Sequence, residues 1–186
     1  MPSASALTNP LRLAAIALLM AASPAHPQAY RDTAGEAGEI LAAHNLARAE
    51  VGVAPLVWSE RLARDAQRWG EYLAANNLYE HASPQERRGQ GENLWRGPRG
   101  YWDARTKIGF FVEEKRLFVP GSFPEVSRSG RWNDVAHYTQ VIWPQTREVG
   151  CAVVTTQSDE VLVCRYWPAG NIWGYPIDPR QQLARR

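Results

Sequence analysis

The spacing of apolar residues predicts two helices in the first half of the chain. The first covers residues 36–51 and follows a capping-box pattern, Thr33-x-x-Glu36. The second is capped by Ser59 and runs to about Asn76. Its apolar face is formed by Leu62, Ala66, Trp69 and Leu73. Both helices are therefore expected to pack one face against a core.

The middle of the chain shows weaker periodicity. Residues 78–101 have no clear period and are rich in Gly, Pro and Arg, so we expect a loop with short helical or extended pieces. Asp103 is placed to cap a third helix that extends to about Phe118. A short helix over residues 133–142 is expected next, because Pro144 prevents its continuation.

Two strand-like runs follow these helices. They cover Val149–Thr156 and Glu160–Trp167, and the residues between them have turn chemistry. A hairpin symmetric about that turn places Cys151 directly opposite Cys164, within reach of a disulfide. Two buried free thiols are the alternative. Helices first and antiparallel strands last indicate an α+β domain.

The N-terminal stretch has a different character. Leu11–Ala22 is a short apolar run with one Arg near its start, and small residues follow it. This pattern predicts a secretory signal peptide over residues 1–25, cleaved after Ala25 or Ala29. The run is shorter than the roughly 20 residues that a spanning helix needs. An uncleaved anchor is the alternative. We therefore expect a secreted protein, extracellular or periplasmic, in which a disulfide forms by default.

Composition narrows the class of function. The chain has 186 residues, enough for one domain, and its 21 basic and 19 acidic residues give a formal charge of +2. The basic residues form no tract, so a nucleic-acid partner is not expected. We expect a monomer with no transmembrane segment in the mature form.

Histidine is the side chain best suited to proton transfer or metal binding near neutral pH. Apart from His26, at the predicted signal boundary, the chain holds only His44, His81 and His137. On the first helix, His44 shares a face with apolar residues. We interpret it, with Asn45 and Arg48, as a buried hydrogen-bonding set that ties the helix to the sheet.

Six motifs, in order, resemble those of the CAP superfamily of cysteine-rich secretory, antigen 5 and pathogenesis-related 1 proteins. They are His44-Asn45-x-x-Arg48, Val51-Gly-Val-x-Pro-Leu-x-Trp58, Gly91-Glu-Asn-Leu94, His137-Tyr-Thr-Gln-Val-Ile-Trp143, Val149-Gly-Cys-Ala152 and Val163-Cys-x-Tyr-x-Pro-x-Gly-Asn171. The resemblance implies a three-layer α–β–α sandwich with a central antiparallel sheet. It places this domain at residues 36–175, followed by a tail at 176–186.

The resemblance also implies a cleft with two His and two Glu. Its members match His81, Glu92, Glu114 and His137, with Glu113 as the alternative to Glu114. Successive helical positions differ by about 100°, so only one of the two adjacent carboxylates can point inward.

Such a tetrad can serve several functions. It can hold Zn²⁺ or another divalent metal with His81, His137, Glu92 and Glu114 as ligands. It can also be a purely structural set of satisfied polar groups. The resemblance implies a binding module for a sterol, a fatty acid or a cell-surface partner. A metal-assisted or acid–base hydrolase is the alternative, although Ala82 follows His81 where many members of the superfamily have Ser.

Overall fold

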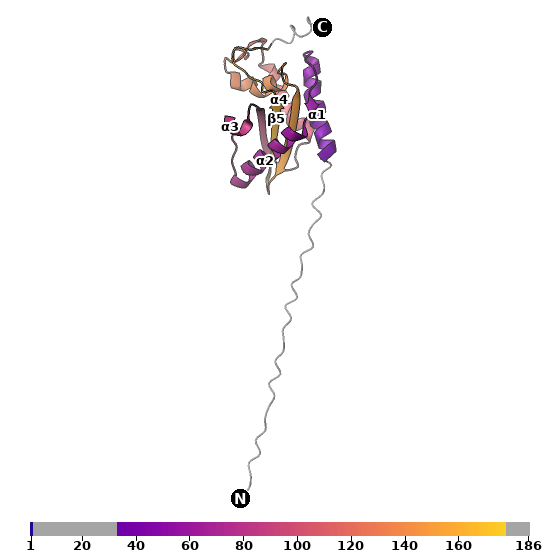
Figure 1. The fold of residues 1–186 in the computed structure, drawn as a ribbon, viewed down its shortest axis with the longest axis vertical. Coiled ribbons are helices and arrows are strands. Elements are labelled where there is room, and N and C mark those ends of the chain that lie inside the picture. Colours follow the sequence, from indigo (N-terminus) through magenta and orange to yellow (C-terminus); the bar gives the residue numbers. More distant parts are fainter. Residues whose placement is uncertain (2–32, 178–186) are drawn as a thin grey trace. The chain divides into compact units, whose positions relative to one another are not determined.

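The computed structural model describes Met1 and residues 33–177. The expected signal peptide, both of its cleavage sites and residues 178–186 of the expected tail lie outside the described residues. Figure 1 shows the helices and strands of the described domain. Among them, no helix combines the length and hydropathy required to cross a bilayer.

A four-stranded sheet forms the middle layer, in the order β1-β4-β5-β2. Its strands are β1 (Val57–Trp58), β2 (Gly91–Pro98), β4 (Glu148–Thr155) and β5 (Asp159–Trp167). The last three pair antiparallel; β4 and β5 form the predicted hairpin, and β2 pairs with β5 in addition. The short β1 pairs parallel with β4, so the sheet as a whole is mixed.

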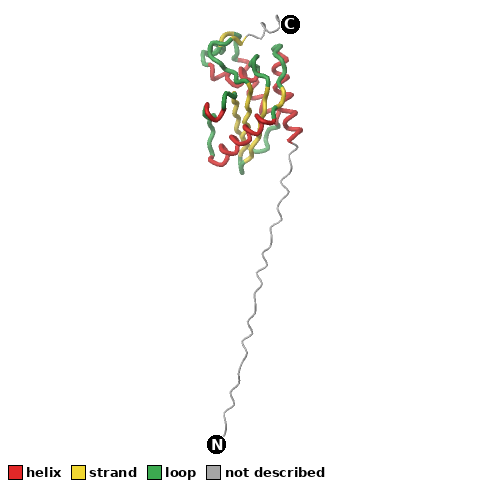
Figure 2. The backbone as a smooth tube through the Cα atoms, viewed as in Figure 1, coloured by secondary structure: helices red, strands yellow, loops and turns green. Residues whose placement is uncertain are grey.

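Helices cover both faces of this sheet, which confirms the expected three-layer sandwich (Figures 1 and 2). The helical elements are α1 (Thr33–Glu50), α2 (Glu60–Asn76), α3 (Pro84–Arg87), α4 (Ala104–Glu113), η1 (Glu114–Arg116), η2 (Trp132–Val135) and α5 (Ala136–Val141). A further pair of strands, β3 (Gly121–Ser122) and β6 (Pro176–Ile177), lies outside the main sheet.

Each face of the sheet has its own hydrophobic core. The smaller core packs Ala66 and Leu73 of α2 against Leu94 and Val163 of the strands. The larger core joins α1, α4 and α5 to the opposite face; its centre includes Ile40, Ile108, Val141, Leu162 and Cys164. Alternate strand residues therefore serve different cores, as the period of two in a strand requires.

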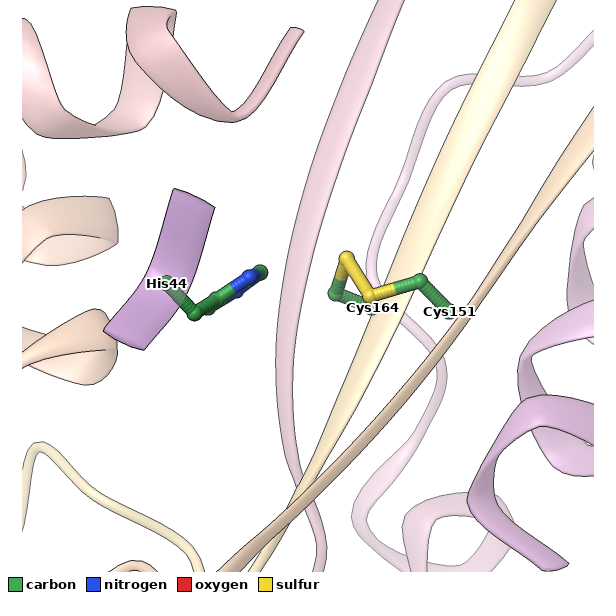
Figure 3. A group of neighbouring side chains, drawn as sticks. All are labelled: His44, Cys151 and Cys164. Carbon is green, nitrogen blue, oxygen red and sulfur yellow. A yellow bond between two sulfur atoms is a disulfide. The ribbon is translucent and has the colours of Figure 1, made fainter. Parts of the chain in front are cut away.

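The cysteine hairpin is confirmed. Cys151 pairs with Cys164 in the β4–β5 register and forms a disulfide with it. The imidazole of His44, on α1, points at this disulfide from the side of the larger core (Figure 3).

Buried hydrogen bonds from α1 explain the spacing of the first motif, His44-Asn45-x-x-Arg48. His44 Nε2 accepts from the Tyr166 hydroxyl on β5 at 2.8 Å, because its Nδ1–H donates to the Ile40 carbonyl. Asn45 bonds both backbone groups of Leu56. These bonds tie α1 to the sheet and to the segment before β1, as the sequence indicated.

Arg48 forms hydrogen bonds with more segments of the chain than the sequence suggested. Its guanidinium donates to the carbonyls of Ala54, Val141, Trp143 and Thr146 at 2.6–3.1 Å. The side chain is fully buried, and burial lowers its pKa to about 10. Carbonyl dipoles thus stabilise a cation inside the protein.

The structure differs from the predictions at element boundaries and in one strand. Helix α1 begins at Thr33 rather than Glu36, and the third helix changes to 3-10 geometry at Glu114. Ser59 occupies the N-cap of α2 but makes no capping bond, whereas Asp103 accepts from the Thr106 amide as expected. Strand β2 arises within the segment expected to be mainly loop.

Candidate functional site

A cleft of about 290 Å³ opens where β2, α5 and the segment after β5 meet. It is lined by His81, Arg87, Gly91, Glu92, Asn93, Phe123, Trp132, Ala136, His137, Gln140, Ala169, Gly170, Asn171 and Trp173. Three of the four predicted site residues therefore line one cavity. The fourth, Glu114, contacts one of those three directly.

His81 and Glu92 form the first pair of the cleft. Glu92 Oε1 accepts a hydrogen bond from His81 Nδ1 at 2.7 Å and another from the Ala82 amide at 3.0 Å. The carboxylate of Glu92 is fully buried, while the His81 side chain is 56% exposed. A buried anion therefore holds an imidazole at the surface of the cleft.

The charge of Glu92 is neutralised by the buried Arg165. The Nε of Arg165 lies 3.0 Å from Glu92 Oε2, and both side chains are buried. Arg165 also donates to Gln90, which in turn donates to Asp65 on α2. Burial lowers the pKa of Arg165, and the Glu92 charge opposes this shift. The charge of Glu92 is thus offset by a buried ion pair with the scaffold, although Oε2 of Glu92 and Nε of Arg165 lack a hydrogen bond of normal geometry.

His137 and Glu114 form the second pair. Glu114 Oε1 accepts from His137 Nδ1 at 2.6 Å, and Oε2 accepts from the amides of His137 and Tyr138. The carboxylate thereby satisfies two amides in the first turn of α5. The Phe111 ring stacks on the His137 imidazole with centroids 4.9 Å apart. The structure thus brings Glu114, rather than the alternative Glu113, to His137.

The two His–Glu pairs have the same hydrogen-bonding arrangement. In each, a carboxylate binds Nδ1 of the imidazole and a neighbouring backbone amide. Because a carboxylate only accepts, Nδ1 carries the proton, and a neutral ring then has its lone pair on Nε2. Among residues 33–177, neither Nε2 has a hydrogen-bond partner. Both Nε2 atoms remain available to a ligand.

The four side chains do not form a compact cage of ligand atoms. In the described part of the chain, the one group of three His, Cys, Asp or Glu whose ligand atoms all lie within 4.8 Å is His44, Cys151 and Cys164 (Figure 3). Both sulfurs of that group are bonded to each other, so it offers no thiolate. At the cleft, the imidazole nitrogens without a partner among the described residues are the two Nε2 atoms, and these are the atoms that could hold a metal.

Comparison with known proteins identifies the family. The profile described as "CAP: Cysteine-rich secretory protein family" matches residues 41–166. Pathogenesis-related protein 1C of Nicotiana tabacum is 36% identical over 137 residues, which cover 73% of this chain and 77% of that protein. The chain belongs to the CAP family.

Other CAP proteins agree with this assignment. Golgi-associated plant pathogenesis-related protein 1 of Homo sapiens is 32% identical over 136 residues, which cover 72% of this chain and 83% of that protein. The structure of BmVAL-1 matches with a TM-score of 0.66 at 22% identity, covering 78% of this chain and 82% of that one. Na-ASP-1 matches with a TM-score of 0.64 at 24% identity; the match covers 74% of this chain and 40% of that longer one. The CAP fold is therefore shared over most of this chain.

Sequence reasoning missed part of the CAP cleft. Phe123 is buried and packs edge-to-face against Trp132 and Trp173, which are 37% and 66% exposed. All three line the cleft and give it an aromatic wall. Trp143, by contrast, is fully buried in the core.

Arg165 was also missed, although the sequence carried a signal for it. It is the one cationic residue of β5 and directly follows the apolar run Val161–Cys164, and a buried charge at such a position needs a partner. Asn93 is a further connection, since its amide donates to both the Tyr166 hydroxyl and the His137 carbonyl. Asn93 and Tyr166 therefore link the cleft to His44 through hydrogen bonds.

Proposed function

We propose that this CAP protein is an exported binding module whose cleft binds a divalent metal through His81 and His137. The observation that carries the proposal is the pair of imidazoles in one cleft, each fixed at Nδ1 by a carboxylate and open at Nε2. Such carboxylate–histidine pairs are typical of protein metal sites.

A metal at this site would bind reversibly, because the protein supplies only two of its ligands. His81 and His137 would supply two nitrogen ligands, and solvent or a bound partner would complete the shell. Glu92 and Glu114 would orient the imidazoles rather than bind metal. Glu92 Oε1 and both Glu114 oxygens already accept hydrogen bonds from the protein, and Glu92 Oε2 is ion-paired with Arg165. The structure described as NaASP2 with Zn²⁺, which matches this chain with a TM-score of 0.62 at 23% identity, supports testing zinc first.

The module would also bind an apolar ligand or a surface partner. The exposed rings of Trp132 and Trp173 beside the histidines offer apolar contact area at the mouth of the cleft. A sterol or a fatty acid is the ligand class to test, by saturable binding of radiolabelled lipid to the mature protein. Absence of saturable binding at micromolar lipid would leave only a surface partner.

No observation favours the hydrolase alternative. In the described residues, no Ser or Cys side chain is hydrogen-bonded to either cleft imidazole, and the nearby Ser83 hydroxyl accepts from the Glu86 amide at the start of α3.

Calorimetric titration with Zn²⁺ tests the metal site. We expect His81→Ala and His137→Ala each to weaken binding at least tenfold, because each removes one of two ligands. Glu114→Gln should weaken it by about 10- to 100-fold, the usual effect of losing an orienting carboxylate. Glu113→Gln is the matched control, since it alters the neighbouring charge without touching His137, and it should leave the affinity unchanged. Zinc binding that survives the double histidine variant would refute the site.

A further inference from the structure

The outer edge of β4 lacks a partner strand over most of its length. Strand β1 pairs only with Glu148 and Val149, after which the chain leaves the sheet and enters α2. Strand β4 continues to Thr155. Within the described residues, no strand lies beside this edge from Cys151 to Thr155. An edge of this kind is a template for another extended chain.

The hairpin geometry shows which backbone groups face this edge. Directly opposite residues of an antiparallel pair alternate between hydrogen-bonded and non-hydrogen-bonded positions, with Cα spacings of about 5.5 and 4.5 Å. Cys151 and Cys164 are 4.1 Å apart, so they form a non-hydrogen-bonded pair. The N–H and C=O of Cys151 therefore point away from β5, and those of Val153 do the same two residues on.

The contact with β1 supports this parity. The Ser59 amide donates to the Val149 carbonyl on the same outer edge, two residues before Cys151. Beyond that bond, the described residues supply no further hydrogen bond to the edge at Cys151 or Val153. The outward N–H and C=O groups of Cys151 and Val153 are thus available to another chain.

A groove of about 350 Å³ lies along this open edge. Ala37 and Ile40 of α1 line one side, and Ala63 and Arg64 of α2 line the other. Trp58 closes the end where β1 stops, and its indole N–H donates to Glu60. The volume falls within the roughly 300–1,000 Å³ typical of ligand sites. The groove is separate from the His81–His137 cleft, since no residue lines both.

We propose that this groove binds an extended peptide segment of a partner protein as an added strand on β4. Helices α1 and α2 flank the edge, so a single extended chain can enter whereas the edge of a folded sheet cannot. The same walls exclude a second copy of this chain paired through its own β4. Main-chain hydrogen bonds would supply the affinity in this mode, and side-chain pockets the preference.

The lining of the groove indicates the chemistry of the peptide. Its floor and walls carry small or apolar side chains, which suit alternating small apolar residues. The rim carries the carboxylates of Glu36 and Glu60 against one guanidinium, Arg64. Because the rim carries charged groups of both signs, a segment with a charged residue at each end suits it, and lysine at both ends also keeps the peptide soluble.

A pentapeptide provides the direct test. It carries a lysine at each end and alternating valine and threonine between them, and both termini are blocked. Titration into ¹⁵N-labelled protein should shift the amides of Cys151, Val153, Ala37 and Ala63. No shift at these amides at millimolar peptide, or shifts confined to the His137 cleft, would overturn the proposal.

Backbone methylation distinguishes strand addition from ordinary side-chain binding. Two versions of the peptide are methylated on alternate amides, one on the odd and one on the even positions. In an added strand only one set of amides faces β4, so one version should lose binding at least tenfold and the other should change less than twofold. Equal behaviour of the two versions would show that no strand is formed.

Substitution on α1 gives an independent control. Ala37→Trp fills the groove and should reduce peptide affinity at least tenfold, whereas Ala42→Trp, at an exposed position of the same helix, should not. If Ala37→Trp fails to fold, the methylated peptides still decide the question. A concentration-dependent dimer that the peptide dissociates would instead assign the edge to a second copy and overturn the proposal.

Discussion

At the scale of single residues, each cleft carboxylate divides its two oxygens between the cleft and the scaffold. Glu92 uses Oε1 for His81 and Oε2 for the buried Arg165. Glu114 uses Oε1 for the imidazole of His137 and Oε2 for amides of α5. Replacing either residue therefore affects both the orientation of an imidazole and the local fold, so affinity and stability must be measured together.

The buried His44 should make stability depend on pH. Burial lowers its pKa from 6.5 to about 4, so the folded chain binds fewer protons than the unfolded chain between these values. The stabilising contribution is present above pH 6.5 and is lost as the pH falls towards 4. Urea unfolding should show that the wild type loses about 2 kcal/mol more than His44→Gln between pH 7 and pH 4.5. Equal losses in the two proteins would contradict this assignment.

At the scale of elements, the sequence predicted those segments whose pattern has a clear period. The amphipathic α2 and the cysteine hairpin were both predicted, because burial on one face fixes the period. Strand β2 was not, since Gly91, Asn93, Gly97 and Pro98 have low strand propensity. Pairing with β5 along the whole of β2 overrides that propensity, and pairing is a tertiary effect that local sequence does not reveal.

Close contact between β4 and α2 depends on Gly150. A Cβ at this position would overlap the backbone of Ser59, Leu62 and Ala63 at the start of α2. Gly150→Ala should therefore lower the free energy of unfolding by about 1–3 kcal/mol, the usual range for overpacking. The measurement is urea denaturation monitored by tryptophan fluorescence.

Gly109 is the matched control for this substitution. It lies in α4 with open space around its Cα, so Gly109→Ala should stabilise the protein by about 0.5–1 kcal/mol through helix propensity. Destabilisation by both changes would indicate a general intolerance of alanine rather than a specific contact.

At the scale of the whole molecule, the cleft joins residues from segments that are distant in the chain. His81 precedes α3, Glu92 lies on β2, His137 lies in the first turn of α5, and Trp173 follows β5. The motifs of the family identified the histidines and carboxylates, but no local pattern placed Trp132 and Trp173 beside them. Those positions follow from packing around Phe123, which only the folded chain shows.

Metal binding by the folded cleft should raise the stability of the entire domain. A ligand at 100 times its dissociation constant adds about 2.7 kcal/mol if it binds only the folded state. For a domain of this size the melting temperature should rise by roughly 5–10 °C, measured by calorimetry with and without Zn²⁺. The double variant His81→Ala/His137→Ala should show no rise, and an equal rise there would place the metal elsewhere.

The four carbonyls bound by Arg48 determine which segments any independently folding fragment must contain. They come from the loop before β1 and from the end of α5 and the turn beyond it, up to 98 residues away along the chain. A polypeptide that starts after α1 would leave these buried acceptors without their donor. We therefore expect a fragment to fold only if it contains both α1 and the segment that carries His137. Cuts in the chain between them should be tolerated better than separation of these two parts.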